Sequence, residues 1–135
     1  MSNKYKFGNK EIEMVLAQSN EVRFDYFIKR VADWGEVWGL KGSDGWVMSA
    51  DETGKQVAVF WPFAEFAELC STGLWEGTIP TSISIEAYTT RWLPGLEKDG
   101  RLVGVFPNLL KQAAVITPMQ LLRIINDERE KLELE

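Results

Sequence analysis

The sequence predicts an α+β fold of about five mostly antiparallel strands packed with four to five helices. Three observations predict it. Segments 36–40 and 55–61 are rich in valine and aromatic residues and enclose a middle strand segment, two more strand segments follow between 101 and 116, and apolar residues recur at helical spacing elsewhere. At 135 residues, we expect a single domain, 1–135, that is loose at residues 1–8 and in the last few residues.

The first group of strands is predicted to be a three-stranded meander at residues 36–40, 46–50 and 55–61. Each connection ends in a glycine, Gly45 or Gly54, which can adopt the positive φ that short hairpin loops require. The third segment has apolar side chains on both alternating faces, so we expect cover on both sides of the sheet. Segments 101–106 and 113–116 form the expected two-stranded pair. Residues 71–80 are expected to be an irregular loop.

Apolar spacing predicts helices at residues 9–17, 21–34, 63–70, from 84 onward and at 118–131. Ser19 or Asn20 is expected to cap the second helix and Gly35 to end it. In that helix Arg23 is assigned to the polar side. Pro94 is expected to kink or break the fourth helix, because proline has no backbone donor.

The last helix has the clearest start signal. Thr117 stands at the capping position, Pro118 at the first helical position, and Gln120 three residues after the cap.

Charge and composition exclude several classes of protein. The chain has 20 acidic and 15 basic residues, a net charge of −5, and its lysines and arginines do not cluster, so we expect no nucleic-acid binding. It has no apolar run of the roughly 18 residues that cross a membrane, and no signal peptide is apparent. We therefore expect no membrane association and a cytoplasmic location. The single Cys70 agrees with a reducing compartment.

Several short motifs run through the chain: RFDYFIKRVADW at residues 23–34, EVWGL at 36–40, DGW at 44–46, WP at 61–62, EFA at 65–67, RWLPGL at 91–96 and GVFP at 104–107. Together they resemble a bacterial family known as "domain of unknown function 2750", over about residues 20 to 118. The resemblance implies a small cytoplasmic bacterial protein. It supplies no catalytic residues.

The sequence argues against enzymatic activity, because it contains no histidine and only one cysteine. We expect no catalytic residue, no metal site and no cofactor. Glu65 and Glu68 stand one helical turn apart and could in principle act as a catalytic pair, but a solvated helix face is the favoured interpretation. Asp51 and Glu52 are interpreted as turn residues. Cys70 is expected to be buried.

The aromatic residues give the main functional hypothesis, because six tryptophans and seven phenylalanines are many for this length. Trp75 lies in a glycine-flanked loop, where binding residues often sit. The leading hypothesis is a non-enzymatic protein-binding domain with an aromatic surface around Trp75 and the meander. The alternative is a small-molecule binder with an aromatic-walled pocket and Arg91 at its mouth. The candidate residues are Trp75, Trp38, Trp61, Arg91 and Trp92; strand order and oligomeric state stay open.

Overall fold

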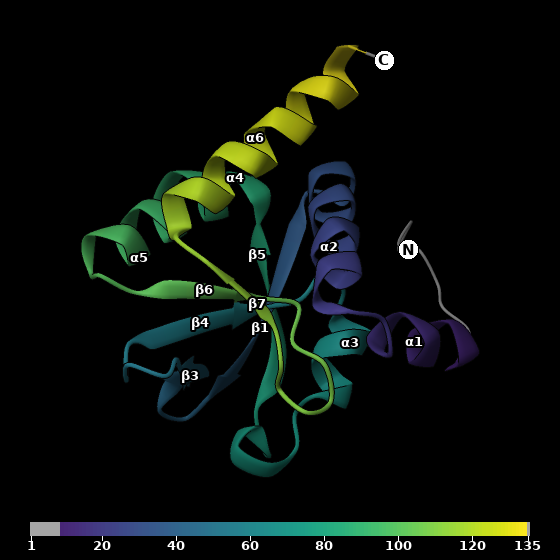
Figure 1. Ribbon diagram of the computed structural model, residues 1–135, viewed down its shortest axis with the longest axis vertical. Helices are drawn as coiled ribbons and strands as arrows, with labels where there is room; N and C mark the ends of the chain where they lie inside the picture. Colours follow the sequence, from purple (N-terminus) through teal and green to yellow (C-terminus); the bar gives the residue numbers. More distant parts are fainter. Residues whose placement is uncertain (1–8, 135) are drawn as a thin grey trace.

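The computed structural model describes residues 9–134 (Figure 1), so the loose end expected at residues 1–8 lies outside the described residues. The helical segments are α1 (Asn9–Leu16), α2 (Asn20–Trp34), α3 (Ala64–Leu69), the 3₁₀ turn η1 (Gly73–Trp75), α4 (Ile85–Ala87), the π turn η2 (Tyr88–Trp92), α5 (Leu93–Lys98) and α6 (Pro118–Leu134). The strands are β1 (Glu36–Gly42), β2 (Gly45–Trp46), β3 (Met48–Ala50), β4 (Gln56–Phe60), β5 (Ile79–Ser84), β6 (Leu102–Val105) and β7 (Ala114–Ile116). Helix α6 continues to Leu134, past the end at residue 131 that the sequence predicted.

The strands form two sheets, which confirms the α+β class. One sheet has the order β2-β1-β5 and is antiparallel, and the other has the order β3-β4-β6-β7. Within the second sheet β4 and β6 run parallel, so the expected two-stranded pair is not separate. Its first strand, β6, pairs with β4, which is the third segment of the expected meander.

The expected meander is divided between the two sheets. Its middle segment breaks at Val47: β2 pairs with β1, whereas β3 pairs with β4. The N–H group of Val47 donates to the carbonyl oxygen of Leu40 at 2.9 Å. Trp38 and Trp61 exchange two main-chain hydrogen bonds, of 2.9 and 2.7 Å, and this bridge connects the sheets.

Strand β5 corrects the expected loop at residues 71–80, since it begins at Ile79 and pairs with β1 along six residues from Glu36↔Ser84 to Lys41↔Ile79. It contains Pro80 and several hydroxyl residues, so it lacks the alternating apolar pattern of a central strand. Because β5 lies at the edge of its sheet, it tolerates a proline.

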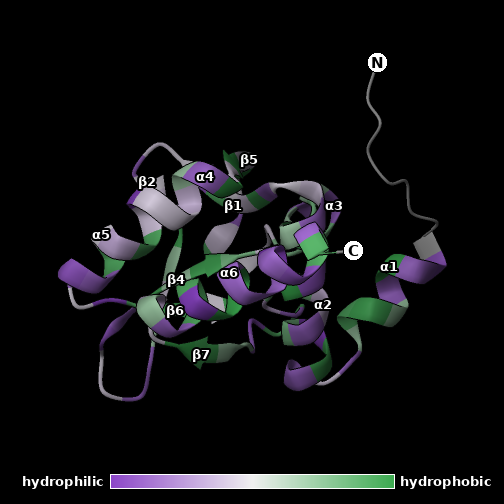
Figure 2. Cartoon of the chain, turned by 90° about the horizontal axis from the view of Figure 1, so that it is seen from above, coloured by the Kyte–Doolittle hydropathy of each residue, from purple (hydrophilic) through white to green (hydrophobic). Residues whose placement is uncertain are grey.

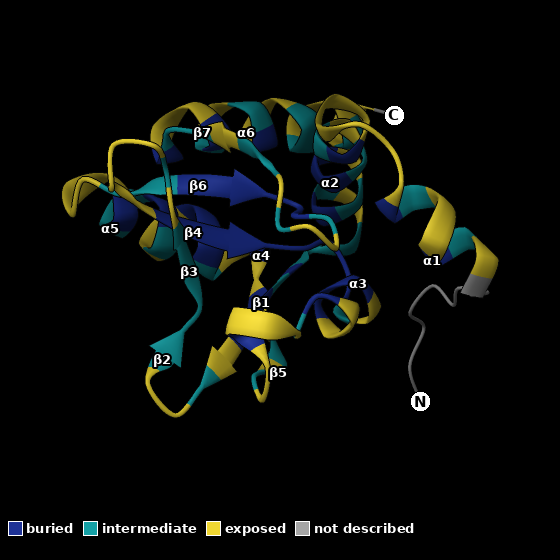
Figure 3. Cartoon of the chain, turned by 60° about the horizontal axis from the view of Figure 1, so that its bottom comes forward, coloured by how far each residue is buried: buried dark blue, intermediate teal, exposed yellow. Residues whose placement is uncertain are grey.

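The helices lie mainly on one face of the four-stranded sheet. Figure 2 shows α6 crossing β4 and β6 with its hydrophilic side outward. Between them lies a core that includes Phe27 and Val31 from α2, Leu121 and Ile125 from α6, and Val103 and Val105 from β6. In Figure 3 the opposite face of β4 and β6 has no helix in front of it. All residues of β4 after Gln56 are nevertheless buried, as the two-sided apolar pattern predicted.

The predicted cap and end of α2 and the predicted start of α6 are confirmed. The Ser19 hydroxyl accepts a hydrogen bond from the N–H of Val22 at 3.2 Å, and Gly35 closes α2 with a φ of 77°. At α6 the N–H of Gln120 donates to the Thr117 hydroxyl at 3.3 Å, while the Gln120 side chain accepts from the N–H of Thr117 at 3.4 Å. Within residues 9–134, no helix has both the length and the apolar character needed to span a membrane.

The helical segment around Pro94 contains a π turn. The N–H of Leu93 donates to the carbonyl oxygen of Tyr88, the i→i+5 bond that defines this turn. Because Pro94 has no N–H, the turn before it lacks one ordinary donor, and the wider turn accommodates the proline. The helix continues through Pro94 as α5 instead of ending there.

Candidate functional site

A cavity of about 620 Å³ lies between the β1–β2 hairpin, β3, the π turn and α5; we call it the Trp46–Trp92 groove. Apolar side chains and charged side chains both line it. The lining residues are Asp44, Trp46, Met48, Gln56, Arg91, Trp92, Gly95, Leu96, Asp99 and Arg101.

Trp46 is placed by the hairpin and by a glycine beneath it. Its indole ring lies across β1 at Gly39, where a Cβ atom would come within 2.9 Å of two ring carbons. Because real Cβ atoms do not approach so closely, a side chain at position 39 would displace the ring. The absence of a side chain at Gly39 therefore allows the Trp46 ring to lie in this position.

Trp92, the last residue of the π turn, forms the wall that adjoins Trp46. The Trp46 and Trp92 rings meet edge to face, with centroids 4.7 Å apart and an interplanar angle of 84°. Trp92 also contacts the buried ring of Phe60, at 5.8 Å and 90°. Both indoles are half-buried. The core therefore holds the two rings in place, while part of each ring stays accessible from the groove.

Two guanidinium groups, of Arg91 and Arg101, line the same groove. Neither makes a hydrogen bond or an ion pair with another residue in the described range 9–134. Asp44 and Asp99 are exposed and balance their formal charge. A guanidinium group can form two parallel hydrogen bonds to a carboxylate, and it also stacks on flat rings. The groove thus combines flat apolar walls with unused donors for an acidic group.

Sequence reasoning found Arg91 and Trp92 but missed Trp46, Met48 and Arg101. The local sequence only weakly indicates that Trp46 lines a site, because a tryptophan after a hairpin glycine is equally suited to a core. Its contact with Trp92 depends on how the hairpin packs on the π turn, a long-range contact that no motif records.

Trp61 and Trp75 are not surface residues, so the aromatic surface expected around Trp75 is corrected. Trp75 is 4% exposed and Trp61 is fully buried. Their rings meet edge to face with centroids 5.7 Å apart, and the Trp61 indole N–H donates to the carbonyl oxygen of Pro107 at 3.0 Å. Gly73 has a φ of 58°, which lets η1 turn the Trp75 ring inward. Trp38 is half-buried and serves the bridge between the sheets.

Cys70 is buried, as expected, and its Sγ atom lies 3.5 Å from the carbonyl oxygen of Pro107. Burial raises the pKa of the Cys70 thiol to about 11, more than its neighbours lower it, so at neutral pH it is protonated and unsuited to nucleophilic attack. Asp51 occupies its turn as interpreted: one carboxylate oxygen accepts bonds from the Thr53 hydroxyl at 2.7 Å and the Lys55 N–H at 2.9 Å. These bonds, that of Thr53 above all, lower the pKa of Asp51.

Arg23 is buried, which corrects its assignment to the polar side of its helix. Its Nε donates to the carbonyl oxygen of Phe106 and its Nη2 to that of Gln112, both at 2.8 Å. Further bonds reach the Gln18 carbonyl oxygen and the Asn20 side chain. Desolvation lowers the pKa of this guanidinium. The position in the sequence gives no sign of this role, since these acceptors include main-chain atoms far along the chain.

A second cavity of about 620 Å³ lies on the helix-free face of the four-stranded sheet, over Val57, Val59 and Gly104. Its buried cation, Arg23, is already bonded to carbonyl groups, and Lys111 lies over the ring of Trp75, 4.7 Å from its centroid. Unlike the two guanidinium groups of the Trp46–Trp92 groove, that of Arg23 already donates four hydrogen bonds. Among residues 9–134 no group of three or more histidine, cysteine, aspartate or glutamate side chains is arranged to hold a metal ion.

The comparison with known families is consistent with the motifs noted in the sequence. The family described as "Protein of unknown function (DUF2750)" matches residues 24–125. This range includes the whole Trp46–Trp92 groove and excludes α1. No curated protein and no solved structure matches the chain.

Proposed function

We propose that this chain, which belongs to the DUF2750 family of proteins of unknown function, is a non-enzymatic binding protein that holds a small, planar acid in the Trp46–Trp92 groove. One observation carries the proposal: two half-buried indole rings line one cavity with two guanidinium groups that have no partner among residues 9–134. A location in the cytoplasm is part of the proposal, because the buried Cys70 is a free thiol.

The geometry suits a flat ligand. Ligand pockets usually combine apolar or aromatic walls with a few placed polar groups, and a cavity of about 620 Å³ lies within their usual range. The indoles of Trp46 and Trp92, with Met48 and Leu96, give the apolar contacts. Arg91 or Arg101 then binds the carboxylate in a bidentate manner.

The charge balance of the groove argues for a ligand of low charge. Asp44 and Asp99 offset the two arginines, so the groove has no strong positive field of the kind that attracts a polyphosphate or a nucleic acid. A monocarboxylate or a zwitterion suits this balance better. A protein partner bound through an aromatic surface around Trp75 and the meander is not proposed, because Trp75 and the meander residue Trp61 are buried.

The test is a titration with three planar acids, benzoate, nicotinate and indole-3-carboxylate, each paired with its neutral amide. Binding is followed through the indole N–H signals in two-dimensional NMR of ¹⁵N-labelled protein. At least one acid is expected to shift the Trp46 and Trp92 signals and to bind more tightly than its amide. The Trp61 signal should not move, because its N–H is buried and bonded to Pro107.

Variants assign the effect to the groove. Arg91→Gln combined with Arg101→Gln should reduce the affinity for the acid by about tenfold or more, since each charged hydrogen bond contributes about 1.5 to 3 kcal/mol. Arg123→Gln is the matched control, because Arg123 is exposed on α6 outside the groove. Equal binding of acids and amides, or no shift of Trp46 and Trp92 with any acid, would overturn the proposal.

A further inference from the structure

Helices α1 and α3 and the loop at residues 108–110 form a surface whose residues differ from those of the Trp46–Trp92 groove. We call it the leucine–glutamate surface. It contains two neighbouring hollows of about 380 Å³ each. Both hollows are lined by Glu13 and Leu69, so they lie next to each other. Leu109 and Leu110 line one of them.

Three large apolar side chains are exposed on this surface. Leu69 is 44% exposed, Leu109 56% and Leu110 78%. Single exposed leucines are ordinary, but a group of them around two adjacent hollows is typical of an interaction site. Each hollow also reaches one buried side chain, Ile12 in one and Leu16 in the other.

The loop that carries the two leucines is held in one shape. The Asn108 side chain accepts bonds from the N–H groups of Leu110 at 3.0 Å and Gln112 at 2.9 Å. The carbonyl oxygen of Gln112 in turn accepts from Arg23 at 2.8 Å. Leu109 and Leu110 are therefore presented to solvent on an ordered loop, and a partner need not order it on binding.

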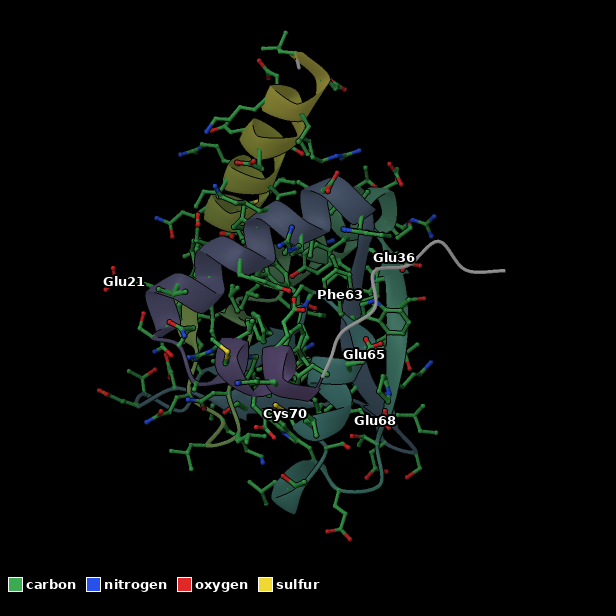
Figure 4. The ribbon with its side chains drawn as sticks, turned by 90° about the vertical axis from the view of Figure 1, so that its right-hand side faces the viewer. Glu21, Glu36, Phe63, Glu65, Glu68 and Cys70 are labelled. Carbon is green, nitrogen blue, oxygen red and sulfur yellow. The ribbon has the colours of Figure 1, made fainter. Side chains whose placement is uncertain are left out.

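Carboxylates form the rim of this surface. Glu13, Glu65 and Glu68 are exposed and line the hollows, and no lysine or arginine lines either hollow within residues 9–134. None of the three carboxylate groups makes an ion pair or a hydrogen bond with another described residue. In Figure 4, Glu65 and Glu68 lie along one edge of the molecule together with Glu36, whereas Glu21 lies at the opposite edge.

We infer that the leucine–glutamate surface binds a basic amphipathic helix of another protein, with apolar side chains in the two hollows and lysine or arginine side chains at the glutamate rim. The exposed leucines supply the apolar contact, and the unpaired carboxylates supply the charge complementarity. An anionic membrane or a nucleic acid would be repelled by the same rim. A symmetric pair of two copies of this chain would place the acidic rims against each other.

The test uses a fluorescent synthetic peptide of leucine and lysine, with leucines at helical spacing and lysines elsewhere. The peptide is titrated with the protein and its anisotropy is measured. A peptide of the same composition with strictly alternating leucine and lysine is the control for unspecific attraction to an acidic protein. The helical peptide is expected to bind at least about tenfold more tightly than the alternating one.

Two groups of variants decide which residues bind the peptide. The triple variant Glu13→Gln, Glu65→Gln, Glu68→Gln and the double variant Leu109→Ser, Leu110→Ser should each weaken binding of the helical peptide by about tenfold or more. All five residues are exposed, so both variants should fold, and their melting temperatures check this.

The matched control changes the same amount of charge on another part of the chain. Asp127→Asn, Glu130→Gln and Glu133→Gln neutralise three exposed carboxylates on α6 and should alter the affinity by less than about twofold. An equal loss in this control, no binding by the unmodified protein, or dimerisation that the double leucine variant abolishes would each overturn the inference.

Discussion

The Nε atom of Arg23 donates a hydrogen bond of 2.8 Å to the carbonyl oxygen of Phe106, a buried residue with a φ of 57°. A left-handed φ is unfavourable for a phenylalanine and persists only where surrounding contacts hold it. The N–H of Phe106 also donates to the carbonyl oxygen of Phe60 at 2.8 Å. Arg23 thus holds the backbone at Phe106, directly after β6. Through Gln112 it also holds the loop that carries Leu109 and Leu110.

Replacing Arg23 should destabilise the protein strongly. Arg23→Met removes the donor for three carbonyl groups, of Gln18, Phe106 and Gln112. Because each buried unsatisfied acceptor costs about 1 to 3 kcal/mol, and solvent can reach the partly buried ones, the free energy of unfolding should fall by about 3 kcal/mol. Urea denaturation followed by tryptophan fluorescence measures this.

The control for Arg23 lies on the same helix. Lys29 is exposed and lies 3.9 Å from Asp25, so Lys29→Met should change the free energy of unfolding by less than about 0.5 kcal/mol. A similar small change for Arg23→Met would show that the four bonds of Arg23 contribute little to stability.

The position of Trp46 should depend on the absence of a side chain at Gly39. In Gly39→Ala the new methyl group would meet the indole ring at 2.9 Å, so the ring must move and the free energy of unfolding should fall by about 1 to 3 kcal/mol. The Trp46 indole signal should shift in NMR spectra.

Gly95→Ala provides the comparison for this substitution. Gly95 lies within α5, and a Cβ there would meet no atom within 4 Å. Alanine favours helix over glycine, so this variant should gain up to about 1 kcal/mol. If Gly39→Ala is as stable as Gly95→Ala, the ring of Trp46 is not held as described.

The stability of the protein should fall between about pH 9 and pH 11 because of Cys70. Burial raises the pKa of its thiol from the ordinary 9.0 to about 11, so the unfolded chain releases this proton at a lower pH than the folded protein does. The contribution is fully present below pH 9 and is lost as the pH rises through about 11, and the loss amounts to about 2 to 3 kcal/mol.

Urea denaturation at a series of pH values measures this loss, and Cys70→Ala serves as the reference. Alanine does not ionise, so the variant starts from a lower stability but should lack this part of the decline, while the lysines and tyrosines contribute equally to both proteins. Parallel curves for the two proteins would contradict the raised pKa.

Tyr88 has a buried hydroxyl group without a hydrogen-bond partner among the described residues, and burial raises its pKa well above 10. Tyr88→Phe removes this unsatisfied group and keeps the ring, which contacts Phe60 with centroids 5.0 Å apart. The melting temperature should rise, corresponding to a gain of about 1 kcal/mol. The neighbouring Thr89 differs from Tyr88, because its buried hydroxyl group has a partner: it donates to the Ile85 carbonyl oxygen at 2.9 Å. A lower melting temperature for Tyr88→Phe would reveal a partner for the hydroxyl.

Local signals in the sequence were enough to place the helix ends and the hairpin turns. The Ser19 cap, the Gly35 end and the Thr117–Gln120 pair each involve residues within a few positions of one another. Such contacts form in the same way whatever the rest of the chain does, which is why their residue types are informative. The lack of histidine is likewise a property of composition alone.

The partners of each strand and the exposure of each tryptophan were decided by the tertiary structure. Trp75 has two glycines beside it and Trp46 has one, yet Trp75 is buried against Trp61 while Trp46 borders a groove with Trp92. An indole ring is equally suited to a core and to a binding surface, so its neighbours in sequence do not determine its place. Only the packing of the hairpin, the π turn and β6 brings Trp46, Trp92, Arg91 and Arg101 together, because these contacts join segments far apart along the chain.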